Sequence, residues 1–72
     1  MIRVSSENIH SMAYYPLSMR LFVRFMKEEI LYIYENVPER EWYGLRAALY
    51  LDQYFNFHIA GKYPVSKRNI KY

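Results

Sequence analysis

Asn36-Val37-Pro38-Glu39 lies between two long stretches in which apolar residues recur at helical spacing. The four residues are typical of a capping box, in which the first side chain accepts hydrogen bonds from free backbone amides and the fourth reaches back. Proline is also well suited to the first turn of a helix. The motif therefore predicts that one helix ends and another begins within two or three residues, as in an antiparallel helical hairpin.

The stretch before this connection, residues 17–35, is predicted to form the first long helix. Its buried face would hold six apolar residues spaced three or four apart, namely Met19, Phe22, Val23, Met26, Ile30 and Ile33. A second apolar strip beside that face comprises Leu21, Phe25 and Tyr32. One packed neighbour cannot cover both strips, so part of this surface is expected to meet another chain.

The stretch after the connection, residues 38–60, is predicted to form the second long helix and to end at Gly61, since glycine readily adopts the left-handed conformation of a helix terminus. One of its stripes is apolar and contains Trp42, Leu45 and Leu49; the other contains Tyr43, Ala47, Tyr50 and Tyr54. Gly44 is expected to allow another segment to approach this helix closely, at a cost of roughly 1 kcal/mol in helix propensity.

The two ends of the chain are predicted to be a short helix over residues 5–15, with Ser5 or Ser6 as its N-cap, and a basic tail over residues 61–72. Pro16 would interrupt the chain between the first helix and the next. Residues 2–4 alternate as in a strand, so a short strand paired with residues 69–72 stays open as an alternative. The expected fold is a single all-α domain spanning residues 1–72.

Size and composition limit what this domain can be. A chain of 72 residues buries only roughly 60% of its surface on folding, so it is marginally stable by itself. It contains no cysteine, which excludes disulfides and thiolate metal sites. We find no signal-peptide pattern and no apolar run of the roughly 18 residues that suggest a membrane span, so a cytoplasmic protein is expected.

The sequence carries no recognisable catalytic equipment. Its two glycines lie far apart, whereas a phosphate-binding loop needs clustered glycines. His10 and His58 lie near opposite ends of the chain, and neither is followed by a second histidine or a carboxylate three or four residues later. We therefore expect no enzyme activity, no metal and no cofactor.

Nine tyrosines suggest a recognition surface, because tyrosine joins a large apolar ring to a polar tip. Our first hypothesis is a protein-binding module of the inhibitor or adaptor type, either docking on a larger protein or forming a homodimer. The predicted contact residues are Tyr43, Tyr50, Tyr54, Phe57, Leu21, Phe25 and Tyr32. Cationic residues would steer the encounter with an acidic surface.

The alternative hypothesis is a small basic nucleic-acid-binding regulator. Three cations would share one face of the first long helix, and the last twelve residues carry four cations and no acid. Such side chains can contact phosphates, while tyrosines stack on bases. The residues assigned to steering or to nucleic-acid contact are Arg20, Arg24, Lys27, Lys62, Lys67, Arg68 and Lys71.

Overall fold

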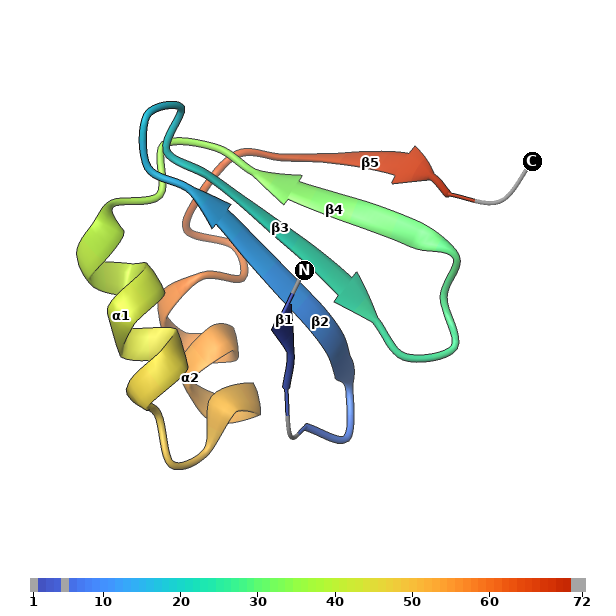
Figure 1. The fold of residues 1–72 in the computed structure, drawn as a ribbon, viewed down its shortest axis with the longest axis horizontal. Coiled ribbons are helices and arrows are strands. Elements are labelled where there is room, and N and C mark those ends of the chain that lie inside the picture. The colour runs from blue at the N-terminus through green and yellow to red at the C-terminus, as the bar shows by residue number, and fades with distance from the viewer. Residues whose placement is uncertain (1, 5, 71–72) are drawn as a thin grey trace.

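The computed structural model describes residues 2–4 and 6–70, which form one antiparallel sheet and two short helices (Figure 1). Each strand pairs with the next along the chain, in the order β1-β2-β3-β4-β5. The strands are β1 (Ile2–Arg3), β2 (Ile9–Tyr15), β3 (Arg20–Phe25), β4 (Ile30–Tyr34) and β5 (Val65–Asn69). Helices α1 (Glu39–Ala47) and α2 (Leu51–His58) lie between β4 and β5 in the chain.

The predicted all-α fold and its helical hairpin are wrong, because residues 17–35 form β3 and β4 instead of a helix. In β3, the fully buried Leu21 and Val23 alternate with outward residues, which is the two-residue period of a strand. Residues spaced three or four apart also fitted a helix. Long-range pairing with β2 and β4 decides between the two periods, since it satisfies the backbone on both sides of β3.

The predicted helix over residues 5–15 is also wrong, and the predicted pairing between the two chain ends is not formed among the described residues. The expected short helix over residues 5–15 is largely β2, which pairs with β3 after a turn that contains Pro16. The expected basic tail includes β5, which pairs with β4. Because β1 pairs with β2, residues 2–3 and β5 lie at opposite edges of the sheet and do not pair with each other.

The predicted helix over residues 38–60 is divided into α1 and α2 by extended backbone at Ala48 and a non-helical Tyr50. A continuous helix of that length would span roughly 34 Å, whereas strands of five to seven residues span roughly 17–24 Å. Dividing the helix lets both halves pack on the sheet. The predicted capping box is not formed, since α1 begins at Glu39 without a side-chain cap.

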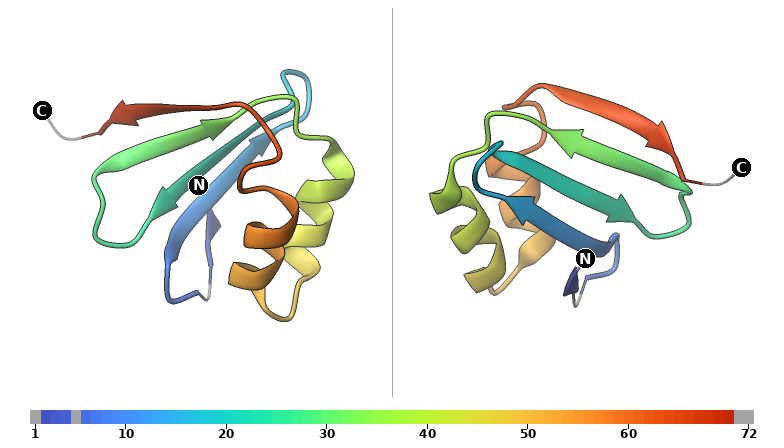
Figure 2. Two further views of the ribbon diagram at one scale, coloured as in Figure 1. Left: turned by 180° about the vertical axis from the view of Figure 1, so that it is seen from behind. Right: turned by 45° about the horizontal axis from the view of Figure 1, so that its top comes forward.

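Both helices pack on the same face of the sheet (Figure 2). The core lies between these two layers. The sheet contributes Ile9, Met12, Leu21, Val23 and Tyr34, and the segment after β4 contributes Val37, Trp42, Leu45, Leu51, Phe55 and Ile59. The opposite face of the sheet carries no helix among the described residues. None of the described helices is long and apolar enough to cross a membrane.

Candidate functional site

The helix-free face of the sheet is defined by the strand register. Residues paired across antiparallel strands point to the same side, and the next residue along each strand points to the other. Leu21 and Val23 point into the core, so the alternate pairs point away from the helices. The residues of the helix-free face are Arg3, Ser11, Ala13, Tyr15, Arg20, Phe22, Arg24, Leu31, Ile33, Ser66 and Arg68.

One row of this face crosses all five strands and holds three arginines. Arg3 pairs with Ser11, Ser11 with Arg24, Arg24 with Leu31, and Leu31 with Arg68. Arg3, Arg24 and Arg68 thus come from β1, β3 and β5, and we call them the arginine row. Sheet pairing brings these residues into one row, although Arg24 and Arg68 are 44 positions apart in the sequence.

The neighbouring rows of the helix-free face present aromatic rings. Phe22 is half-buried, and its ring lies edge-on to that of Tyr15, with 5.2 Å between the centroids. Tyr15 remains 53% exposed at the end of β2. The face therefore places the Phe22 ring two residues from Arg24 along β3, and the Tyr15 ring four residues from Ser11 along β2.

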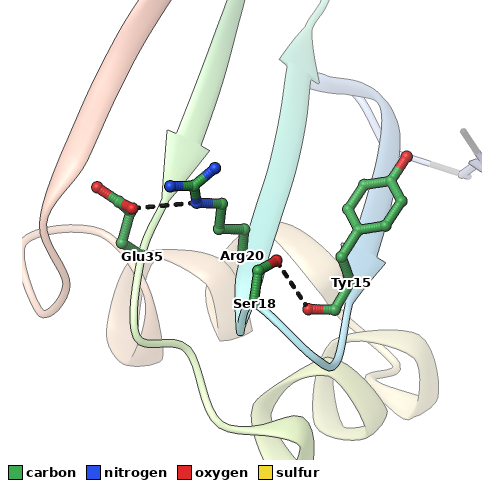
Figure 3. Close-up of polar contacts among 4 residues, drawn as sticks. All are labelled: Tyr15, Ser18, Arg20 and Glu35. Carbon is green, nitrogen blue, oxygen red and sulfur yellow. Dashed lines mark hydrogen bonds and ion pairs between the residues drawn. The ribbon is translucent and has the colours of Figure 1, made fainter.

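None of the ion pairs formed among the described residues includes a member of the arginine row. At the end of this face, the Nε atom of Arg20 lies 3.1 Å from Oε1 of Glu35, and this is the pair drawn in Figure 3. The remaining ion pair joins His58 and Glu41 in the helical layer. Among the described residues, no carboxylate lies within ion-pairing distance of the three guanidinium groups of the row.

A polar hollow of about 460 Å³ lies next to the arginine row, at the hairpin between β3 and β4. His10, Arg24 and Lys27 line it together with Glu28 and Glu29. His10 is the additional residue of a β-bulge, since the register shifts between Ile9 and Ser11. Partial burial, and then the charges of Arg3 and Arg24, lower the pKa of His10. The two arginine charges thus add to the effect of burial at this corner.

The predicted protein-binding residues differ in exposure and come from several elements. Tyr43, Tyr50 and Phe57 are 58%, 66% and 70% exposed, but they lie on α1, on the turn after it and on α2. Leu21 is completely buried in the core, where no partner can touch it. Phe25 and Tyr32 pack against each other at 4.9 Å on the helix side of the sheet.

The predicted cationic residues are also divided. Arg20, Arg24 and Arg68 lie on the helix-free face, whereas Lys67 points to the opposite side, with Nζ 5.2 Å from the centre of the Tyr32 ring. Lys27 is in the hairpin after β3, and Lys62 follows α2. Lys71 lies outside the described residues. The sequence analysis did not identify Arg3, Phe22 and Tyr15 as site residues. The alternation of Arg20, Phe22 and Arg24 could have indicated Phe22, whereas Arg3 and Tyr15 join the face only through strand pairing.

A second polar cluster lies in the helical layer around Glu41, whose side chain is 12% exposed. Glu41 accepts hydrogen bonds from the hydroxyls of Tyr54 at 2.7 Å and Tyr63 at 3.3 Å. Burial, and then the hydrogen bond to Glu41, raise the pKa of Tyr54 to about 12. This cluster ties α1 to α2 and to the segment before β5. Among the described residues, no group of three metal-binding side chains comes together.

Comparison with known proteins gives the family of this chain. Residues 5–63 match the model of the KTSC domain. The crystal structure of a KTSC domain protein from Yersinia pestis is similar, with a TM-score of 0.82, 32% sequence identity, and coverage of 96% of this chain and 93% of that one. No curated protein matched. Neither name specifies an activity, a ligand or a partner. The chain belongs to the KTSC domain family.

Proposed function

We propose that this protein binds single-stranded nucleic acid on the helix-free face of its sheet. The observation that carries this proposal is the arginine row, in which three guanidinium groups from three strands form no ion pair among the described residues and share one face with the rings of Phe22 and Tyr15. This arrangement supports the sequence-based alternative of a basic nucleic-acid-binding protein, although the contact residues come from a sheet and not from a helix.

The arginine row suits a phosphate backbone that crosses the strands. Adjacent strands lie about 4.8 Å apart, so five strands present a surface roughly 19 Å wide. Each guanidinium group can donate two parallel hydrogen bonds to one phosphate. Phosphate contacts of this kind release counterions, so the affinity should fall steeply as salt rises.

The aromatic rings favour a single strand over a duplex. Unpaired bases can stack on exposed rings, whereas the bases of a duplex are already stacked on one another. The helix-free face is also a sheet surface with no described helix projecting from it, so it offers nothing shaped for a major groove. The same face can accept different bases, because every base has a flat apolar surface.

The protein-docking hypothesis remains a prediction. It relied on one continuous aromatic helix face, and the aromatic residues in question are distributed over α1, a turn and α2. Homodimer formation likewise remains a prediction. The cytoplasmic location expected from the sequence is part of the present proposal.

The proposal is tested by fluorescence anisotropy with a labelled twelve-residue oligouridine and a duplex of equal length, over a range of salt concentrations. The informative variant carries Arg3→Gln, Arg24→Gln and Arg68→Gln. We expect its affinity for the single strand to fall at least tenfold. The slope of log affinity against log salt should fall by about 2, since each lost phosphate contact contributes about 0.7.

A matched control removes the same charge from the other side of the molecule, through Arg40→Gln, Arg46→Gln and Lys62→Gln. These residues lie in or after the helical layer and are exposed. We expect this control to lose less than threefold in affinity. If both triple variants lose affinity equally, binding depends on net charge alone and the helix-free face is not the site.

A further inference from the structure

Strand β5 leaves one edge of the sheet open. It pairs with β4 on one side, and none of the helices and strands described for residues 2–4 and 6–70 lies along its other side (Figure 1). All five residues of Val65–Asn69 are exposed. At the opposite edge, β1 is only two residues long, so β5 is the longer of the two edge strands.

The backbone groups along this open edge follow from the hydrogen bonds at the ends of β5. The amide of Glu35 donates to the carbonyl of Pro64, and the amide of Ile70 donates to the carbonyl of Glu29. In an antiparallel pair every second residue bonds to the neighbouring strand, so Ser66 and Arg68 face β4. The amides and carbonyls of Val65, Lys67 and Asn69 therefore point outward.

Strand β5 lacks two of the devices that usually prevent an edge from pairing, a bulge and a proline. Its register with β4 has no bulge, and neither proline nor glycine lies within Val65–Asn69. Lysine often protects such edges, but the Lys67 ammonium lies over the Tyr32 ring, 5.2 Å from its centre. The edge is thus a regular template for another strand.

Charge decides which strand fits. Lys67 and Arg68 occupy the middle of β5, and Lys62 precedes it. A second copy of β5 in antiparallel pairing centred on Lys67 would place two lysines opposite each other, which is destabilising. An acidic strand would place carboxylates opposite both cations.

We infer that the open edge of β5 binds an extended acidic segment of another protein as a sixth strand. Lys67 and Arg68 point to opposite faces of the sheet, so two consecutive acidic residues of the partner would meet one cation each. The partner segment would therefore carry an adjacent pair of carboxylates within a run of strand-forming residues. This inference shares Arg68 with the arginine row, but it goes beyond the nucleic-acid proposal because it rests on Lys67 and on the outward backbone groups of β5.

Amide hydrogen exchange measured by NMR tests the geometry directly. The probe is a twelve-residue peptide of alternating threonine and valine with Glu-Glu at its centre. We expect it to slow exchange at least tenfold at Val65, Lys67 and Asn69. The amides of Ser66 and Arg68 already bond to β4 and should change much less. A peptide with Lys-Lys at its centre is the matched control and should protect none of them.

A proline variant separates backbone pairing from charge. Lys67→Pro removes an outward amide without removing a bond to β4, and should weaken peptide binding at least tenfold. Lys67→Gln keeps the amide and should weaken it only two- to threefold. Circular dichroism reports whether Lys67→Pro remains folded. If Lys67→Pro does not fold, Val65→Pro replaces it, because it removes the outward amide at the first residue of the strand and should likewise weaken peptide binding.

Three results would overturn the inference. The acidic peptide at millimolar concentration could leave the three outward amides unprotected. The three amides could instead be protected without peptide, increasingly with protein concentration, in which case a second copy occupies the edge. Equal protection by oligouridine and by the peptide would show that the edge responds to any polyanion and does not pair with a strand.

Discussion

Gly44 of α1 lies against the side chain of Tyr54 of α2. The Tyr54 side chain fills the space that a Cβ atom at position 44 would occupy. A Cβ atom built at Gly44 would overlap the hydroxyl of Tyr54. That hydroxyl donates to Glu41 one turn earlier on α1, and the Tyr54 ring stacks on His58 with 4.2 Å between centroids. The glycine thus allows the close helix approach expected from the sequence, and it lets a tyrosine reach a carboxylate on the neighbouring helix.

Replacing Gly44 with alanine should destabilise the protein by about 1 kcal/mol. Displacing Tyr54 would cost its hydrogen bond and its ring contact, each worth about 1 kcal/mol. The better helix propensity of alanine would return roughly 1 kcal/mol. Urea denaturation of Gly44→Ala measures the difference.

The control for this prediction is the same substitution in a Tyr54→Ala background. With the ring absent, only helix propensity remains, so Gly44→Ala should stabilise that background by about 1 kcal/mol. An equal loss of stability in both backgrounds would show that crowding by Tyr54 is not the reason for the glycine.

Alkaline pH should weaken the fold through Tyr54. Its pKa is raised from 10.0 to about 12, first by burial and then by the Glu41 hydrogen bond. The unfolded chain ionises near pH 10 while the folded chain resists, so this stabilisation is complete below pH 10 and is lost as the pH rises through about 12. Melting temperatures between pH 9 and 12 should fall less steeply for Tyr54→Phe. Parallel profiles would contradict this assignment.

The sequence predicts some local features of this fold correctly and misses its class. Gly61 does have a left-handed backbone, with a φ angle of 76°, although α2 ends at His58. Ser6 does accept hydrogen bonds from the amides of Asn8 and Ile9, as an N-cap does, but the turn that it closes leads into β2. Local signals of this kind are shared by helices and hairpins.

The class of the fold depends on pairing between distant residues. The run from Arg20 to Phe25 fits both a two-residue and a helical period, and only its neighbours in the sheet separate the two interpretations. The candidate site shows the same dependence. Arg24 was identified from the sequence, but its place in a row with Arg3 and Arg68 follows from the register of five strands.

Phe22 should contribute to nucleic-acid binding more than an exposed phenylalanine elsewhere does. Stacking of one base on an aromatic ring is worth about 1–3 kcal/mol. Phe22→Ala should therefore weaken oligouridine binding about five- to a hundredfold. Phe57→Ala removes the same ring from the exposed side of α2 and should change the affinity less than twofold. Similar losses in the two variants, measured by anisotropy, would place the bases elsewhere.

The two histidines of the chain provide reporters on opposite layers of the molecule. His10 lies beside Arg24 on the helix-free side, and its pKa is lowered by partial burial and by the charges of Arg3 and Arg24. Phosphates bound to the arginine row would offset those positive charges, so oligouridine should raise the pKa of His10. His58 lies in the helical layer, with Nδ1 3.9 Å from Oε2 of Glu41, and provides the control substitution. NMR titration of the His10 imidazole signals, with and without oligouridine, measures the expected change. Since a ligand that raises a pKa binds more tightly when the group is protonated, the affinity should also increase as the pH falls from 7.5 to 5.5. His10→Gln should remove that added pH dependence and His58→Gln should not. Equal pH dependence in the two variants would show that His10 does not sense the bound phosphates.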